Sequence, residues 1–367
     1  MGSDGARLAG VNPCRFAGWP RGLAALALGL LALFLVLSVW TPVTHVAGEA
    51  KPAGELAHEN AERPRDFDLA LYDRVIERLR GGEHYYDFIA EEQRKAEFPL
   101  RPAVAVRLPT LAHVNARLGE TGLVIASFAL LFAVLIAWWR RLGEEEPSSA
   151  VRLSAMALLV FGASLGTARY FFTLHELWAG MLLALAFALH RPGRWGAALA
   201  VAALALAIRE HALPFVLLMA AMAGWRRDWR EAAAWSGLAL AFLLALAWHI
   251  HTVNQMLLPS DGESAPWLVL RGLTGFTSNM VLSSNLRFLD GAIAAPLVIL
   301  ALFGWAGWSR PAGQFGALLF MGYGLLFMLA GRPDNYYWGF MVTPAFFMGL
   351  AFAPRALKGL LTAVARR

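Results

Sequence analysis

The sequence predicts an all-α polytopic membrane protein, and three observations support this fold class. Hydrophobic residues make up 58% of the 367 residues, whereas charged residues make up only 16%. The mean hydropathy of +0.51 is far above that of a soluble enzyme. Apolar runs also recur along nearly the whole chain, as expected for a polytopic membrane protein. The one cysteine, Cys14, excludes an internal disulfide and a cysteine-based metal cluster.

Ten transmembrane helices can be drawn within a single integral membrane domain that covers residues 1–367. They are expected at residues 22–40, 121–139, 153–168, 172–189, 195–208, 212–225, 232–249, 289–308, 314–331 and 336–353. We interpret 22–40 as an anchor, because its 19 apolar residues exceed a usual signal core and Trp40 and Pro42 replace a small-residue cleavage site. Residues 41–120 then form a large extracytoplasmic loop, 121–353 hold the remaining spans, and 354–367 form a cytoplasmic tail.

The distribution of basic residues predicts the orientation. With both termini in the cytoplasm, 16 Arg and Lys residues lie inside and five lie in the short outer loops. The long first loop holds the other 11, but long loops are translocated largely regardless of charge. The net charge of +6 is therefore a topology signal and not a sign of nucleic-acid binding. We expect a multi-pass protein of the bacterial cytoplasmic membrane.

The first outer loop contains two expected amphipathic helices, near 68–80 and 85–97. Leu71, Val75 and Leu79 lie on one apolar stripe of the first helix. Asp66 or Asp68 stands where an N-cap would stand, and two glycines close the far end. The other outer segment, roughly 250–287, has little periodicity. We expect both segments to lie on the membrane surface.

The stretch AIREHALPF, residues 207–215, divides a 31-residue apolar stretch into two runs of about 14. Each run would extend only about 21 Å, short of a hydrocarbon core of about 30 Å. A hairpin keeps both basic flanks inside and turns at Arg209 and Glu210 below the outer interface, where each charge costs roughly 2.5–3.5 kcal/mol. Irregular backbone at that depth requires protein or a water-filled cavity around it. The sequence therefore predicts an outward-open hollow.

Other outer turns also carry polar residues. These are Arg169, His175 and Glu176 in TARYFFTLHELWAG, and Arg332, Asp334, Asn335, Tyr336 and Tyr337 in GRPDNYYWGF. Structural interpretations remain open: a helix cap at Asp66 or Asp68, an ion pair of Arg209 with Glu210, and hairpin-orienting hydrogen bonds from His175 and Glu176. The tyrosines are equally typical of an interfacial aromatic belt. The eight outer histidines have no HExxH or similar spacing, so no metal site is expected.

This layout resembles the GT-C superfamily of membrane glycosyltransferases, which take a sugar from a polyprenyl-phosphate carrier. The segment FDLALYDRVIERLRGGEHYYD is similar to the D-x-x-x-Y … G-x-x-x-Y run that follows the first span in glycosyltransferase family 87, the mannosyltransferase-like branch. The matching positions are Asp68, Tyr72, Gly82 and Tyr86. The resemblance implies a hexosyltransferase that acts on a lipid or glycan acceptor and inverts the anomeric centre.

The chemistry of such a transfer assigns a role to each candidate residue. A carboxylate must take the proton of the acceptor hydroxyl, and we expect Asp68 or, alternatively, Asp66 to be this base. Arginines suit the leaving phosphate because they bind it in bidentate fashion. Arg209 and Arg332 are the first choices, and Arg169 and Arg107 the second. The candidates for sugar or acceptor binding are Tyr72, Tyr86, His175, Glu176, Glu210, His211, Asp334, Asn335 and Tyr336.

Two other functions fit the same composition. A transporter or flippase of a lipid-linked saccharide would also use a one-sided charged cavity, although the chain has no repeat symmetry. A polymerase or ligase of surface polysaccharide would use the same donors on another fold. The expected partners are a polyprenyl-phosphate sugar, an acceptor and membrane lipids. No cofactor is expected, and the need for a divalent cation is left open.

Reporter fusions test the predicted orientation. We expect fusions after positions 45, 210 and 334 to report an extracytoplasmic location, because the basic flanks hold the intervening loops inside. Fusions after positions 145, 192, 228 and 310 should report a cytoplasmic location. A cytoplasmic signal at position 210 would contradict the predicted hollow.

Overall fold

The computed structural model describes residues 14–43 and 67–366, and within this part every regular element is a helix. The chain divides into two compact units. Unit 1 comprises residues 1–50, 132–165 and 268–367, and unit 2 comprises 51–131 and 166–267. Asp66, one of the two candidate bases, lies outside the described residues.

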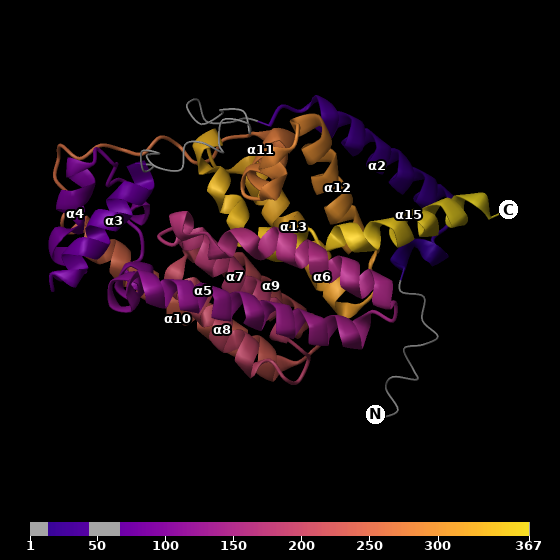
Figure 1. Cartoon of the computed structure of the whole chain (residues 1–367), viewed down its shortest axis with the longest axis horizontal. Coiled ribbons are helices and arrows are strands. Elements are labelled where there is room, and N and C mark those ends of the chain that lie inside the picture. Colours follow the sequence, from indigo (N-terminus) through magenta and orange to yellow (C-terminus); the bar gives the residue numbers. More distant parts are fainter. Residues whose placement is uncertain (1–13, 44–66, 367) are drawn as a thin grey trace. The chain divides into compact units, whose positions relative to one another are not determined.

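Unit 2 contains the two helices expected in the first loop and the short apolar helices in the middle of the chain (Figure 1). Its elements are α3 Phe67–Arg80, α4 Tyr85–Lys95, η2 Ala103–Ala105, the first part of α5 Thr110–Glu145, η4 Arg169–Phe171, α7 His175–Leu189, α8 Gly196–Ile208, η5 Glu210–Ala212, α9 Leu213–Trp225 and α10 Trp229–Asn254. α5 kinks at Gly119, whose φ of 65° favours glycine.

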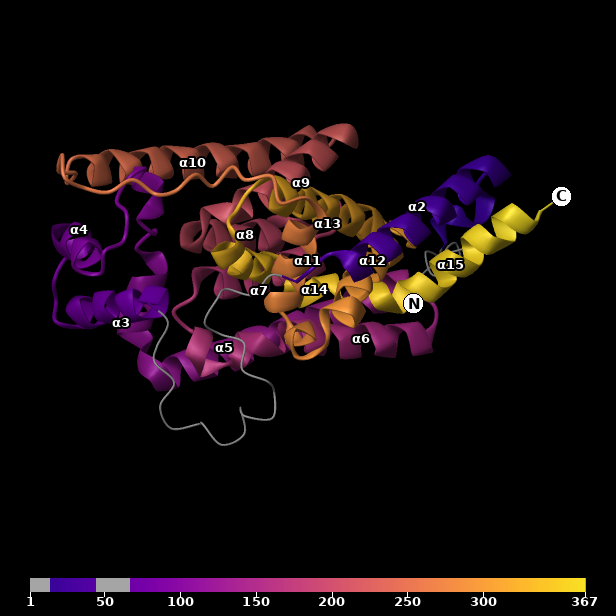
Figure 2. The same cartoon turned by 90° about the horizontal axis from the view of Figure 1, so that it is seen from above.

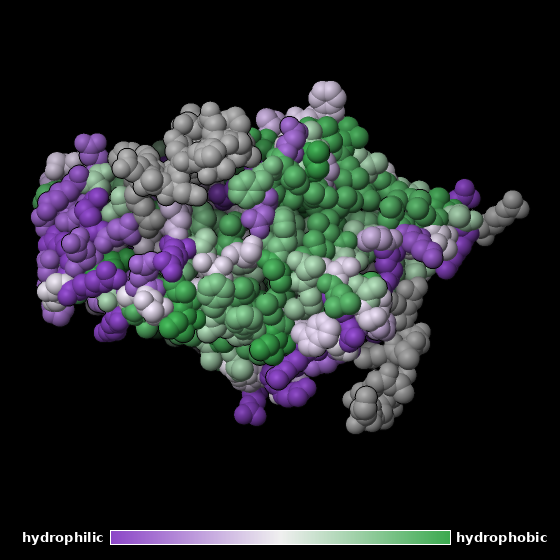
Figure 3. Space-filling view, viewed as in Figure 1, coloured by the Kyte–Doolittle hydropathy of each residue, from purple (hydrophilic) through white to green (hydrophobic). Residues whose placement is uncertain are grey.

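The helices α3 and α4 pack side by side through their apolar faces (Figures 1 and 2). Val75 and Ile76 of α3 and Phe88 and Ile89 of α4 belong to one buried cluster. The opposite faces carry charge, so the surface over both helices is hydrophilic (Figure 3). The alternating burial follows from the helical spacing of the apolar residues.

Arg78 links the polar faces of these two helices. Its guanidinium pairs with Glu83, with Glu91 at 3.0 Å and with Glu92 at 2.9 Å. It also lies over the ring of Phe88, with 4.4 Å from the guanidinium carbon to the ring centroid. One cation therefore connects α3, the turn after it and α4.

Unit 1 contains the remaining helices. They are η1 Arg15–Gly18, α2 Arg21–Trp40, α6 Ser149–Ala163, α11 Gly272–Leu282, η6 Asn285–Phe288, α12 Gly291–Gly307, α13 Pro311–Leu329, η7 Pro333–Met341, α14 Thr343–Phe346 and α15 Gly349–Ala365. The short helix η3 Ser164–Thr167 spans the boundary between the units in the chain.

The backbones of α12 and α15 approach closely at two glycines. A Cβ atom on Gly304 would lie 1.8 Å from the carbonyl oxygen of Gly349, and one on Gly349 would lie 2.0 Å from that of Ala301. Neither position can accept a side chain without separating the helices. The indole of Trp305 fixes the same region by donating to the carbonyl of Phe346 at 2.7 Å.

Within residues 14–43 and 67–366, five helical stretches are long and apolar enough to cross a membrane: Arg21–Trp40, Ala103–Glu145, Ser149–Thr167, Trp229–Asn254 and Pro311–Leu329. Shorter apolar helices are His175–Leu189, Gly196–Ile208, Glu210–Trp225 and Gly291–Gly307. These stretches cover the first nine expected spans. The tenth, 336–353, is instead divided among η7, α14 and the start of α15.

A second difference concerns the segment 250–287, which shows little periodicity in the sequence and which we expect on the membrane surface. The structure contains α11 there, and every residue from Gly275 to Leu282 is buried. A helix that is covered on all sides has no polar face and therefore no amphipathic period to detect. α11 packs against α13 and η7 within unit 1.

In unit 2, an ion pair holds the chain that follows α10 against α4. The guanidinium of Arg94 donates to both carboxylate oxygens of Asp261, at 2.7 and 2.9 Å. The amide of Leu258 donates to the same carboxylate at 2.8 Å. Mainly because of the Arg94 hydrogen bonds, the pKa of Asp261 is lowered to about 2.

This pKa predicts a pH-dependent stability. In the unfolded chain the Asp261 carboxylate protonates near its ordinary pKa of about 3.9, so the pair stabilises the fold fully above that pH. Its contribution is lost as the pH falls through the folded pKa of about 2. We expect Asp261→Asn to lower the melting temperature at pH 7, with the difference from wild type shrinking between these two pH values. The exposed Asp87→Asn is the control; equal melting of Asp261→Asn and wild type at pH 7 would contradict the assignment.

Candidate functional site

The site is built around the first turn of α7. His175 and Glu176 begin this helix and are 3% and 1% exposed. A carboxylate in the first turn is favoured by the helix dipole. The indole of Trp178 donates to the carbonyl of Phe172 at 2.8 Å and fixes the preceding turn against the helix. The chain thereby holds an acid and an imidazole inside an otherwise apolar part of unit 2.

The turn between α8 and α9 supplies the counter-charge. Arg209, 1% exposed, lies between two carboxylates: its Nε is 2.8 Å from Glu176 Oε1, and its Nη1 is 2.5 Å from Glu210 Oε1. His211 Nδ1 lies 3.3 Å from the same Glu210 oxygen. The Nε contact with Glu176 is close but poorly aligned, and Arg209 Nη2 has no hydrogen-bond partner in the described part of the chain. One cation therefore compensates two acids while keeping donor capacity.

The first loop contributes a second guanidinium. Arg107 Nε donates to the hydroxyl of Tyr72 at 3.1 Å, and the Tyr85 hydroxyl donates to the carbonyl oxygen of Arg107 at 2.7 Å. The rings of Tyr72 and His175 meet edge to face, 5.1 Å between centroids. Burial raises the pKa of Tyr72 although the charge of Arg107 opposes this. Tyr72 is therefore a neutral hydrogen-bonding group near pH 7.

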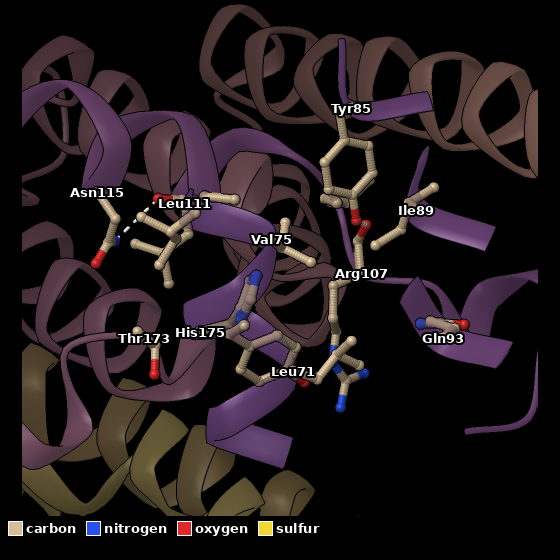
Figure 4. A pocket seen from close by; sticks show the side chains of 14 residues that line it. Leu71, Val75, Tyr85, Ile89, Gln93, Arg107, Leu111, Asn115, Thr173 and His175 are labelled. Carbon is tan, nitrogen blue, oxygen red and sulfur yellow. Dashed lines mark hydrogen bonds between the residues drawn. The ribbon is translucent and has the colours of Figure 1, made fainter. Parts of the chain in front are cut away.

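A narrow pocket lies between these elements, with room for water-sized groups (Figure 4). Its apolar lining comes from α3, α4 and α5, and its polar lining includes Gln93, Arg107, Asn115, Thr173 and His175. The imidazole of His175 points into the pocket (Figure 4). Neither of its ring nitrogens, nor Gln93 Oε1, has a hydrogen-bond partner among the described residues. Buried polar atoms normally have hydrogen-bond partners, so these atoms can form hydrogen bonds with a hydroxyl group or a water molecule that enters the pocket.

Asp68 belongs to the same neighbourhood. It stands four residues before Tyr72, on the same face of α3, and its charge acts on the Tyr72 hydroxyl together with that of Glu176. Because the helix begins at Phe67, Asp68 lies inside the first turn and is not an N-cap. Its carboxylate is half-buried. Unit 2 therefore gathers Asp68, Tyr72, Arg107, His175, Glu176, Arg209, Glu210 and His211.

Tyr86 has a structural partner. Its hydroxyl lies 2.9 Å from His249 Nδ1, and His249 Nε2 lies 3.0 Å from the carbonyl oxygen of Val106. Because a carbonyl only accepts, Nε2 carries the proton and Nδ1 accepts from Tyr86. This chain of hydrogen bonds fixes the residue before Arg107. The sequence placed His249 on the outer side but gave no sign of this bridge.

The other predicted residues belong to different local groups of contacts. Arg332 pairs with Asp334 at 3.0 Å and its amide donates to Asn335, all within the start of η7 in unit 1. Tyr336 follows in the same helix, and its carbonyl accepts from Ser283 at 2.7 Å. Arg169, in unit 2, forms an exposed pair with Glu120 at 2.9 Å.

Metal binding has no visible centre in the described residues, which contain no group of three or more His, Cys, Asp or Glu side chains able to hold an ion. No protein-family model, curated protein or solved structure matches the chain. The functional assignment therefore rests on the side chains of the unit 2 cluster and on the sequence resemblance.

The ion cluster at Arg209 predicts a coupled response to mutation. Arg209→Gln leaves the buried Glu176 and the partly buried Glu210 without their cation, which we expect to cost roughly 3–5 kcal/mol of stability. Adding Glu176→Gln and Glu210→Gln removes the stranded charges and should restore most of the melting temperature in detergent. The control Arg169→Gln breaks only an exposed pair and should cost about 1 kcal/mol or less. If the triple variant melts below Arg209→Gln, Arg209 does not act as the counter-charge.

Proposed function

We propose that the protein is a membrane glycosyltransferase that moves a sugar from a polyprenyl-phosphate donor to a lipid or glycan acceptor at the extracytoplasmic face. One observation carries this proposal: unit 2 contains carboxylates, the guanidinium groups of Arg107 and Arg209, and the buried imidazole of His175. Neither ring nitrogen of His175 has a hydrogen-bond partner among the described residues. Charges are costly inside apolar helical protein, so their retention there argues for chemistry. The resemblance of the first loop to glycosyltransferase family 87 supports the same reaction.

The proposed transfer is a single in-line displacement. The acceptor hydroxyl oxygen attacks the anomeric carbon while the Asp68 carboxylate takes its proton. The bond between that carbon and the phosphate oxygen breaks, and the polyprenyl phosphate leaves with the electron pair. The anomeric centre is inverted, and no oxidant or reductant is needed. Asp68 has the chemistry for this role because it is a half-buried acid whose charge acts on Tyr72, a residue that lines the pocket.

Arg107 and Arg209 are the arginines that suit the departing phosphate. Arg107 directs its Nε toward the neutral phenol of Tyr72, and its guanidinium lines the pocket beside His175. Arg209 keeps the Nη2 donor that neither carboxylate uses. Guanidinium groups stabilise growing phosphate charge through charge-assisted hydrogen bonds. His175 would bind a sugar hydroxyl through one ring nitrogen as acceptor and the other as donor.

Asp68→Asn tests the proposed base. Asn keeps the size of Asp but cannot accept the proton, so we expect sugar transfer to fall by roughly 10²–10⁴-fold while the melting temperature stays close to wild type. The assay is release of polyprenyl phosphate from candidate polyprenyl-phosphate sugars by the purified protein. Asp73→Asn, on the exposed face of the same helix, is the matched control.

Asp66→Asn addresses the alternative base, and we expect the smaller loss there. Full activity of both the Asp68 and the Asp66 variants would end the case for a catalytic carboxylate at the start of α3. Movement of the intact lipid across a vesicle membrane without release of polyprenyl phosphate would instead identify a flippase.

A further inference from the structure

An open groove separate from the His175 pocket lies where the end of α3 meets α5. We call it the basic groove. Its lining residues are Leu79, Arg80, Gly82, Glu83, His113, Ala116 and Arg117. None of them lines the pocket beside His175. The groove lies wholly within unit 2, so its shape depends on the packing of this unit alone.

The charges of the basic groove do not balance locally. Both oxygens of Glu83 pair with Arg78, so this acid is already neutralised by the α3–α4 network. Among the described residues, the hydrogen-bond acceptor of Arg80 is a neutral group, the carbonyl oxygen of Asn115, at 3.4 Å. Arg117 is exposed and has no ion-pair partner in the part of the chain that the structure describes. Two guanidinium groups with uncompensated charge therefore line one hollow, which is the arrangement that binds a phosphate.

The groove also adjoins an apolar surface on the same helix. Arg117 lies two residues before the Gly119 kink, and the apolar part of α5 follows. Ile125 and Phe128 on this part are 65% and 45% exposed. A cationic hollow just before an exposed apolar helix face suits an amphiphile, with a charged head in the groove and hydrocarbon chains along α5.

We propose that the basic groove binds the phosphate of an anionic membrane lipid. Arg80 and Arg117 hold the phosphate oxygens, His113 supplies a further hydrogen bond, and the acyl chains lie against the exposed face that carries Ile125 and Phe128. The site does not depend on sugar transfer, because it shares no residue with the proposed catalytic cluster. A free phosphate would use the same arginines but not the apolar face.

The test is a titration of the full-length protein, purified in a neutral detergent, with dioctanoyl phosphatidic acid. We expect saturable binding that dioctanoyl phosphatidylcholine does not reproduce. Arg80→Gln combined with Arg117→Gln should weaken it by about tenfold or more, since both charge-assisted contacts with the phosphate are lost. Arg80→Lys combined with Arg117→Lys keeps the charge but loses the bidentate geometry of the guanidinium groups. This double variant should bind the lipid with intermediate affinity.

The matched control combines Arg194→Gln and Arg230→Gln, two exposed arginines of unit 2 outside the groove. It carries the same change in net charge and should alter the affinity by about twofold or less. Equal weakening in the two Gln pairs would show binding to overall positive charge and would overturn the proposal. Inorganic phosphate that binds as tightly as the lipid would also overturn it, because the apolar face would then contribute nothing.

Discussion

The neutralisation of one buried acid and one partly exposed acid by Arg209 is the interaction on which unit 2 depends. Glu176 begins α7, Glu210 begins the turn before α9, and Arg209 lies between them. Without the cation, two carboxylates would remain among apolar helices, where an isolated charge costs several kcal/mol. The same contacts link the ends of helices that are distant in sequence. Structural need and chemical capacity therefore coincide in one side chain.

Neutral hydrogen bonds orient the second guanidinium. Tyr85 and His249 hold the carbonyl oxygens of Arg107 and Val106, and Tyr72 accepts from the Arg107 side chain. These partners come from α4, α10 and α3, so the extended segment between η2 and α5 is held by three helices. A guanidinium fixed in this way loses little freedom when it binds an anion. The aromatic residues of the first loop thus support the cluster even where they touch no substrate.

The sequence predicted the elements in which polar and apolar residues alternate or adjoin, and it did not predict the elements that lack such a contrast. The helical stripe through Leu71 and Val75 predicted α3, and the charges of AIREHALPF marked the turn that contains Arg209. The buried helix α11 has no such contrast, and the interruption of 336–353 by short helices leaves its hydrophobicity unchanged. Bridges such as Tyr86 to His249 join residues 163 positions apart, and a single sequence contains no signal for that pairing.

The glycine contact between α12 and α15 limits how unit 1 can change shape. With the backbone at Gly304 against the backbone at Gly349, rotation of either helix about its own axis would drive a side chain into the other's main chain. Sliding is opposed for the same reason, and Trp305 ties α12 to Phe346 at the end of α14, shortly before α15 begins. In any conformational change of the protein, α12 and α15 must therefore move together as one rigid body, and the flexible points must lie elsewhere in the chain.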